Sequence, residues 1–264
     1  MNVGDIINYL NEIAPWQYAE EWDSVGLMVG SRNSNVSKIL LCMDVTSDVI
    51  SEAVENGAQM ILSHHPFIFS KLKAIDMENF KGEQIVKLIK SNVTVVSAHT
   101  NLDTAPGGVN DTLAETLHLI NCHNLKPYIP KGSNCDLGMG KIGELLDYKS
   151  FDDFVKDIKK NLGIENLRII GKKPEKVKNI GVFCGSFDGD LENLKSRKVD
   201  VLVTGDIKYH TALDAAQMGL CIVDAGHFAT ERIILHKLKD TLNKRFKELD
   251  IICSKVEIDP FTFA

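Results

Sequence analysis

Residues 38–65, KILLCMDVTSDVISEAVENGAQMILSHH, decide the fold of this chain. The run from Lys38 to Val45 is continuously apolar rather than alternating, which is typical of a strand buried on both faces of a parallel sheet. A helix follows, begun by Thr46 or Ser47 and closed by Gly57. A second apolar run then ends in two histidines. Strand, helix and strand in this order predict an α/β fold.

The same pattern extends outward along the chain. Apolar spacing predicts further helices at 3–13, 83–92, 109–119, 151–163 and 229–246, and further strands at 93–100, 167–171, 178–185, 199–206, 220–224 and 251–257. Residues 101–108 are expected to form a loop. Residues 121–150 are rich in Gly, Pro, Asn and Lys, which favours a crossing between domains with one strand near 141–146.

The second half of the chain repeats the order of the first. Lys38 to His65 spans 27 residues, and the matching interval from Lys178 to Asp206 spans 28. The alternative is chance similarity between ordinary strand–helix–strand units. We interpret the pattern as a duplication of two similar α/β/α domains with largely parallel sheets. The first domain is expected at 1–125 plus 227–264, and the second at 126–226.

Composition excludes several classes of protein. With 264 residues, 44% hydrophobic and 25% charged, the chain is long enough for a large core and is neither disordered nor collagen-like. The longest apolar run, Ile39 to Met43, is far too short for a membrane helix, and the N-terminus shows no secretory leader. A net charge of −6 argues against a general nucleic-acid binder.

The 6 cysteines form no CxxC pair, which gives no support to a zinc ribbon or a disulfide framework. Cys42, Cys184 and Cys221 lie inside apolar runs. We therefore expect buried reduced thiols and a cytoplasmic location.

Polar clusters follow three of the predicted strands. The clusters contribute His64 and His65, His99 and Asp103, and His227 and Glu231. Ligands of open α/β sheets bind beyond the carboxyl ends of the strands, so we expect these side chains to gather there. His227 and Glu231 are four residues apart at a helix start and share one face.

Each cluster taken alone has a plainer explanation. His64 and His65 fit one core and one surface histidine, Asp103 fits a turn or helix cap, and Glu231 fits a residue that complements a helix dipole. Together, His64, His65 and His227 offer three imidazole nitrogens, and Asp103 and Glu231 offer two carboxylates, which is about the set that two divalent ions require. Such ligands suit Zn, Fe, Mn, Ni or Co.

Two further segments contain residues that suggest a functional site. Residues 184–190 (CGSFDGD) fit an anion-binding turn or, more simply, a Gly-rich connection. Residues 204–210 (TGDIKYH) offer Asp206, Lys208 and His210 to a substrate, or only surface charge. The sequence contains no GxxxxGK[ST], GxGxxG or GxSxG motif, so nucleotide loops and nucleophile elbows of those types are not indicated.

Five ordered motifs resemble the GTP cyclohydrolase 1 type 2 family, also called the Nif-three-like family. They are EEWDSVGLMVG, LSHHPFIF, SAHTNLDTAPGGVND, TGDIKYHTALDA and DAGHFATER, from about residue 20 to about residue 235. Two departures from the family pattern are Ser24, where WDN is common, and the 184–188 stretch, where a GSGS-like segment is common. The chain is short enough to be the compact form without the inserted domain of longer members.

The resemblance implies a dimetal centre in a cleft between two α/β/α domains, in a ring-shaped homohexamer whose metal sites face an internal cavity. It implies two divalent ions per subunit, bound by the family's metal ligands at His64, His65, Asp103, His227 and Glu231. His99 lies in a matching motif and is taken as a residue near the site.

The family name implies a metal-dependent hydrolase that converts GTP to dihydroneopterin triphosphate and formate. His99 and His210 are the candidate general acids or bases. The alternatives are a metal-dependent hydrolase of another nucleotide or a phosphoester, and a non-catalytic metal-binding scaffold ring.

Overall fold

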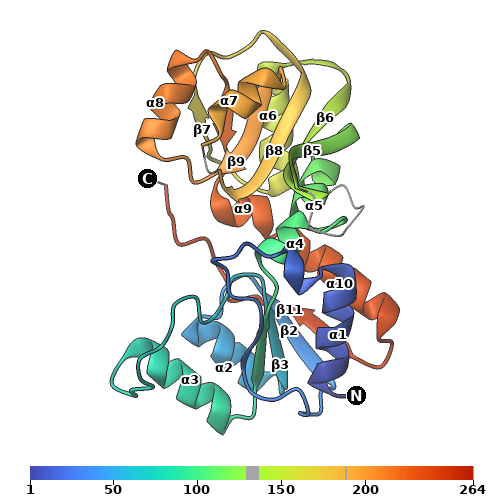
Figure 1. The fold of residues 1–264 in the computed structure, drawn as a ribbon, viewed down its shortest axis with the longest axis vertical. Helices are drawn as coiled ribbons and strands as arrows, with labels where there is room; N and C mark the ends of the chain where they lie inside the picture. The colour runs from blue at the N-terminus through green and yellow to red at the C-terminus, as the bar shows by residue number, and fades with distance from the viewer. Residues whose placement is uncertain (129–136, 188, 264) are drawn as a thin grey trace. The chain divides into compact units, whose positions relative to one another are not determined.

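The structure is a computed structural model that describes residues 1–128, 137–187 and 189–263 (Figure 1). It divides the chain into two compact units. The first unit comprises Met1–Leu102 and Ile234–Pro260, and the second comprises Asp103–Ile233 with the end of the chain from Phe261. Cysteine 135 lies outside the described residues.

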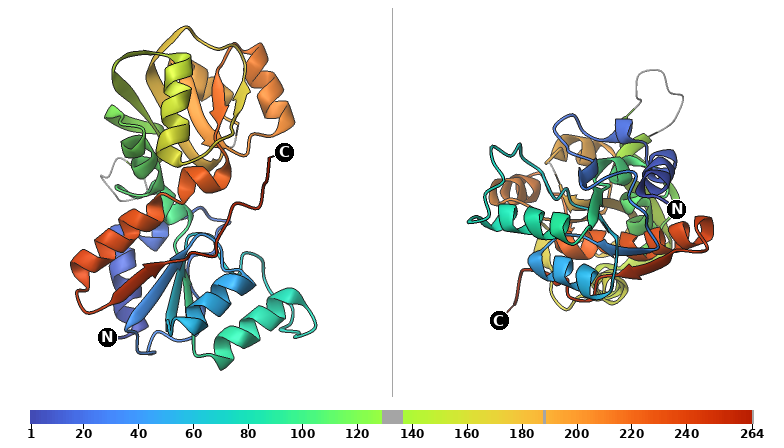
Figure 2. Two further views of the ribbon diagram at one scale, coloured as in Figure 1. Left: turned by 180° about the vertical axis from the view of Figure 1, so that it is seen from behind. Right: turned by 90° about the horizontal axis from the view of Figure 1, so that it is seen from below.

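The first unit contains one five-stranded sheet with helices on both of its faces. Its elements are α1 (Val3–Ile13), the short 3-10 helix η1 (Trp16–Tyr18), β1 (Gly26–Val29), β2 (Lys38–Cys42), α2 (Ser47–Glu55), β3 (Met60–Ser63), α3 (Phe80–Lys90), β4 (Thr94–Ser97), α10 (Ile234–Arg245) and β11 (Asp250–Cys253). The strand order is β1-β4-β3-β2-β11, and only the β1–β4 pair is antiparallel. Helices α2 and α3 cover one face, and α1 and α10 cover the other (Figures 1 and 2).

The decisive stretch folds as its sequence predicts. Residues Ile39 to Cys42 of β2 are fully buried, as a central strand covered on both faces requires. The Thr46 side chain accepts a hydrogen bond from the Val49 amide and so begins α2. Each residue of β2 from Ile39 to Cys42 pairs in parallel with its counterpart in β3.

The second unit contains a six-stranded sheet. Its elements are α5 (Val109–Thr116), β5 (Ile120–Tyr128), β6 (Leu137–Ser150), α6 (Phe151–Leu162), β7 (Arg168–Ile170), β8 (Lys176–Ser186), α7 (Leu191–Ser196), β9 (Val201–Gly205), α8 (Tyr209–Gln217), β10 (Ile222–Asp224) and α9 (His227–Glu231). The strand order is β5-β6-β8-β9-β10-β7. Helices α7 and α8 lie on one face of this sheet and α6 on the other (Figures 1 and 2).

The second sheet is mixed rather than largely parallel. Only β8–β9 and β9–β10 are parallel pairs, whereas β5–β6, β6–β8 and β10–β7 are antiparallel. The segment 121–150, expected to be a crossing between domains, supplies β5 and β6. Because β5 pairs with β6, residues 120–125 belong to the second unit, and the first unit ends at Leu102 rather than at residue 125.

Two local elements also differ from the sequence-based expectation. Residues 101–104, expected in a loop, belong instead to the short helix α4 (Thr100–Thr104), which carries the chain from the first unit into the second. The helix expected at 229–246 is divided into α9 and α10 by a turn at 232–233. This turn is also where the chain returns to the first unit.

Among the described cysteines, all five carry free thiols. Cys42, Cys184 and Cys221 are buried as expected, while Cys122 is exposed. No helix of the described residues is long and apolar enough to cross a membrane.

Candidate metal centre

Three histidines of the first unit meet at the carboxyl ends of β3 and β4. His64 and His65 follow β3, and their amides donate to the carbonyls of Cys42 and Met43, at 3.0 and 2.9 Å. The ring centroids of His64 and His99 lie 5.3 Å apart, and those of His65 and His99 lie 5.6 Å apart. One nitrogen from each ring lies within 4.8 Å of the others, which is close enough for a shared metal ion.

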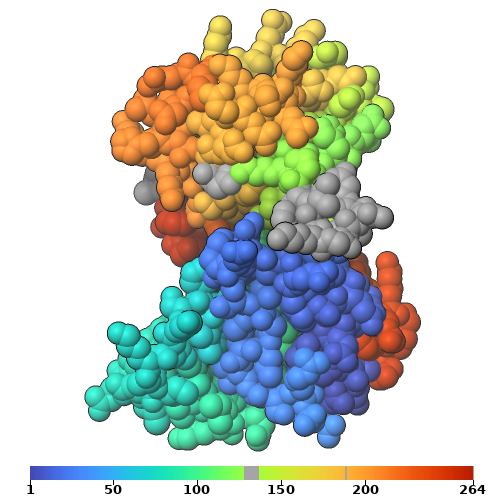
Figure 3. All heavy atoms as spheres, in the orientation of Figure 1, coloured from blue at the N-terminus to red at the C-terminus, as the bar shows by residue number. Residues whose placement is uncertain are grey.

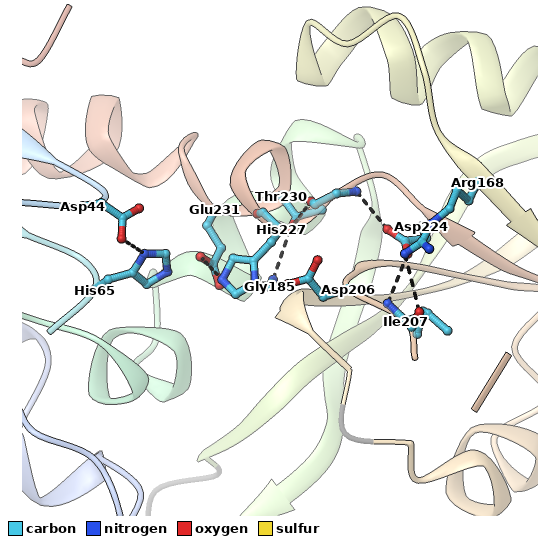
Figure 4. A network of polar contacts seen from close by, with 11 residues as sticks. Asp44, His65, Arg168, Gly185, Asp206, Ile207, Asp224, His227, Thr230 and Glu231 are labelled. Atoms are coloured by element: carbon cyan, nitrogen blue, oxygen red, sulfur yellow. Dashed lines mark hydrogen bonds and ion pairs between the residues drawn. The ribbon is translucent and has the colours of Figure 1, made fainter. Parts of the chain in front are cut away.

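Each of these imidazoles has its Nδ1 held by an oxygen. His64 Nδ1 lies 2.9 Å from the Ala98 carbonyl oxygen, and His65 Nδ1 lies 2.9 Å from Asp44 Oδ1. His99 Nδ1 lies 2.8 Å from Asp23 Oδ1. Because such an acceptor requires the proton on Nδ1, it leaves the Nε2 lone pair for a metal, and it fixes the orientation of the ring. Figure 4 shows the Asp44–His65 pair.

Asp23 is the most heavily bonded of these supporting carboxylates. Its side chain is fully buried and accepts hydrogen bonds from the Thr100 hydroxyl at 2.5 Å, the Thr100 amide at 3.1 Å and the Ser24 amide at 2.7 Å. Burial by itself would raise the pKa of Asp23, but the hydrogen bonds from His99 and Thr100 outweigh it and lower that pKa from 3.8 to about 2.

Replacing Asp23 by asparagine should therefore change how the stability of the metal-free chain depends on pH. The Asp23 pKa is lower in the folded chain than in the unfolded one, so its stabilisation is complete above about pH 4 and is lost as the pH falls toward about 2. We expect Asp23→Asn to lower the free energy of unfolding at pH 6 by at most about 2 kcal/mol, with the difference from the wild type shrinking toward pH 2. Urea unfolding of the chelated chain across this range measures it.

Asp153→Asn is the matched control for this prediction. The pKa of Asp153 is also lowered, chiefly by its hydrogen bonds to Lys156 and Ser150, but its carboxylate lies in solvent. Asp153→Asn should change the pH dependence of the free energy of unfolding much less than Asp23→Asn does. Parallel profiles for wild type and Asp23→Asn would show that the Asp23 carboxylate does not stabilise the fold.

The second unit brings two carboxylates and one histidine together. His227 and Glu231 lie on α9, with His227 Nε2 3.0 Å from Glu231 Oε2. An oxygen of Asp103, from α4, lies within 4.8 Å of an oxygen of Glu231. The exposed fractions of Asp103 and Glu231 are only 5% and 3%. Carboxylates buried to this extent are costly unless cations or donors balance them, and a divalent ion beside both would do so.

His227 is oriented in the same way as the histidines of the first unit. Its Nδ1 lies 2.8 Å from Asp206 Oδ2, so Nε2 is again the nitrogen on the ligand side. Figure 4 shows His227 between Glu231 and Asp206. Asp206, proposed from the sequence as a substrate contact, instead orients the candidate ligand His227.

Gly185, the penultimate residue of β8, makes room for these ligands. Its φ is +63°, and a Cβ there would lie 2.1 Å from Glu231 Oε1 and 3.2 Å from His227 Nε2. Its amide donates to the Thr230 hydroxyl at 3.1 Å, which ties β8 to α9. The 184–190 stretch thus contributes a close approach to the candidate ligands rather than only a connection.

Two further buried side chains, Cys184 and Asp224, support the candidate ligands of the second unit. The Cys184 thiol donates to Asp103 Oδ1 at 3.4 Å, and burial raises the pKa of that thiol, as do the charges of Asp103 and Glu231. Asp224 at the end of β10 pairs with Arg168 and accepts from the amides of Ile207 and Gly226, each at 3.1 Å (Figure 4). These bonds fix the loops that carry Asp206 and His227.

Within each unit, the structure brings the residues predicted from strand ends together. His210 lies instead at the exposed start of α8, where its ring contacts Tyr209 at 5.3 Å between centroids; its catalytic role stays a prediction.

The sequence did not reveal the supporting residues Asp23, Asp44 and Cys184. Asp44 comes two residues after β2, so the same strand-end rule could have found it.

Imidazole and carboxylate side chains gathered at the strand ends of each unit define an α/β protein with candidate ligands for divalent metal. The chain belongs to the Duf34/NIF3 (NGG1p interacting factor 3) family, whose model matches residues 1–260.

Similar proteins cover nearly the whole chain. It is 40% identical over 264 residues to a Clostridium perfringens protein named "GTP cyclohydrolase 1 type 2 homolog", with all of both chains covered. It is 34% identical to the Helicobacter pylori "GTP cyclohydrolase 1 type 2", with 87% of each chain covered. The solved structure of the Staphylococcus aureus hypothetical protein SA1388 matches with a TM-score of 0.92 and 31% identity, covering 100% of this chain and 99% of that one.

Proposed function

We propose that the chain is a metal-dependent hydrolase that opens the guanine ring of GTP, with release of formate and formation of dihydroneopterin triphosphate. The observation that carries this proposal is that His64, His65 and His227 each have Nδ1 held by an oxygen of their own unit. Such rings are prepared to bind metal through Nε2. The name of the H. pylori relative supports GTP as the substrate.

The proposed centre holds two divalent ions, chosen from Zn, Fe, Mn, Ni and Co. Its ligands, drawn from both units, are His64, His65, Asp103, His227 and Glu231. When bound, such ions act as Lewis acids and lower the pKa of water toward neutrality.

His99 is the proposed proton carrier. The buried Asp23 carboxylate holds its Nδ1–H, which fixes the tautomer and stabilises the imidazolium that forms when Nε2 accepts a proton. Histidine 210 is the second proposed proton carrier. A homohexameric ring, implied by the family resemblance, and a cytoplasmic location, inferred from the cysteine usage, complete the proposal.

A formate assay tests the proposed reaction. The chain is loaded with Mn²⁺, Zn²⁺ or Fe²⁺ and incubated with GTP, and released formate is measured. We expect formate from the loaded wild type and none above background from the chelated chain or from Glu231→Ala, because Glu231 is a buried ligand.

The same conditions with other nucleotides and phosphoesters test the alternatives. Turnover of one of these compounds without formate from GTP would reassign the substrate. A fully loaded chain that turns over no member of the panel would favour the non-catalytic scaffold ring.

A further inference from the structure

An exposed aromatic pair lies beside the histidines of the first unit. The exposed fractions of Trp22 and Phe69 are 59% and 55%. Their ring centroids are 5.9 Å apart with planes tilted by 53°, and the Trp22 ring meets His99 edge-on at 6.1 Å. Because tryptophan is usually well buried, so large an exposed indole contributes little to the core and points to a contact with something else.

The backbone beneath Trp22 is firmly held although its ring is in solvent. The Glu20 amide donates to the Thr100 hydroxyl at 3.0 Å, and the Asp23 amide donates to the Glu20 carbonyl at 3.0 Å. The neighbouring Asp23 carboxylate binds His99 and Thr100, as described above. The backbone that carries Trp22 is therefore fixed relative to His99 before any ligand arrives, which lowers the entropic cost of binding.

Phe69 belongs to an exposed segment on the same unit. Residues 69–79, between β3 and α3, are all exposed, and this turquoise part of the chain lies on the surface in Figure 3. The Phe69 side chain contacts Trp22 from this segment. Two aromatic faces from separate parts of the chain are thus presented together next to a candidate proton carrier.

We propose that Trp22 and Phe69 form the stacking subsite for a planar nitrogen-containing ring of the substrate, such as a purine. Indole and phenyl faces stack on any flat heteroaromatic ring without needing particular hydrogen bonds. A ring on Trp22 lies beside His99, where the proposed chemistry takes place. This inference rests on the proposed function. Among the candidate substrates, it favours compounds that contain a flat ring over phosphoesters that lack one.

Fluorescence of Trp22 tests ring binding directly. The chain has two tryptophans, so Trp16→Phe leaves Trp22 as the sole indole emitter. This variant is titrated with GMP and with ribose 5-phosphate, once chelated and once loaded with zinc. We expect saturable quenching by GMP in at least one of the two forms and none by ribose 5-phosphate. Absence of GMP quenching in both forms would overturn the proposal.

Calorimetric titration with GMP measures how much the Trp22 ring contributes to the affinity for GMP. Trp22→Ala should weaken GMP binding about 5- to 150-fold, the range found for base–aromatic stacking. Trp22→Phe should retain most of the affinity. Tyr148→Ala, which removes an exposed ring from β6 of the second unit, should not change it.

The outcomes separate this proposal from the proposed reaction. GMP binding requires no turnover, so a chain that binds the ring but releases no formate keeps the subsite and loses the reaction. Unchanged GMP affinity in Trp22→Ala overturns the subsite whatever the formate assay gives. If that variant instead alters only the oligomeric state in light scattering, the aromatic pair is a contact between copies and the proposal is wrong.

Discussion

Replacing Gly185 by alanine should lower the affinity of the chain for zinc by at least about 100-fold, the upper end of what losing a supporting group costs. The new Cβ would lie 2.1 Å from Glu231 Oε1, so the carboxylate would have to move. His227 Nε2, 3.2 Å away, would be crowded as well. A shift of this size would take the oxygen of Glu231, a proposed ligand, out of bonding range, because metal–oxygen bonds tolerate only a few tenths of an ångström.

Gly57→Ala is the matched control for this variant. Both glycines adopt a left-handed backbone, with φ of +63° at Gly185 and +66° at Gly57, but a Cβ at Gly57 would meet no atom within 4 Å. Both variants should lose about 1 kcal/mol of stability from backbone strain. Only Gly185→Ala should lose zinc affinity, measured by competition with a chelating dye. Equal zinc affinity in the two variants would remove Glu231 and His227 from the centre.

The strand-end rule explains why much of the candidate site was predictable. A buried parallel strand is recognised in the sequence as a continuous apolar run. The residue at which the strand ends can therefore be identified from the sequence. His64, His65 and His99 follow such runs directly, and the structure places their rings together. The rule needs no knowledge of long-range contacts, because parallel strands all end at one edge of the sheet.

The supporting carboxylates were harder to predict because they depend on pairings across the chain. Asp23 lies 76 residues before His99 and follows no apolar run of strand length. Asp44 and Asp206, by contrast, each lie 21 residues before the histidine that they orient. In both units an aspartate that follows one strand holds a histidine that follows the next, but the repeat matches Asp206 with His65, so the two pairs do not occupy equivalent positions of the proposed duplication.

The second sheet shows where local patterns fail. Residues 121–150 contain much Gly, Pro and Asn, yet they supply most of β5 and all of β6, because tertiary pairing overrides weak strand propensity. Gly138 illustrates this, since a Cβ there would lie 2.3 Å from the Lys126 carbonyl oxygen of the paired strand. Glycine, read in the sequence as a sign of a loop, is at this position required by a close approach between strands.

Replacing His64 by leucine should abolish zinc binding while leaving the metal-free fold nearly intact. His64 is 1% exposed, and leucine has a similar volume, so the core stays filled. The Ala98 carbonyl loses its partner at a cost of about 1–3 kcal/mol. Burial of an apolar side chain offsets about 1.5–3 kcal/mol of this cost. We therefore expect the free energy of unfolding of the chelated chain to change by less than about 2 kcal/mol.

Thermal unfolding with and without zinc measures both halves of this prediction. Zinc at 100 times its dissociation constant should stabilise the wild type by about 2.7 kcal/mol and raise its melting temperature. His64→Leu should melt close to the chelated wild type and show no rise with zinc. His236→Leu, an exposed histidine on α10 of the same unit, should keep the full rise. A zinc-dependent rise that survives in His64→Leu would mean that this buried imidazole serves packing rather than metal, because its Nε2 is then not a ligand.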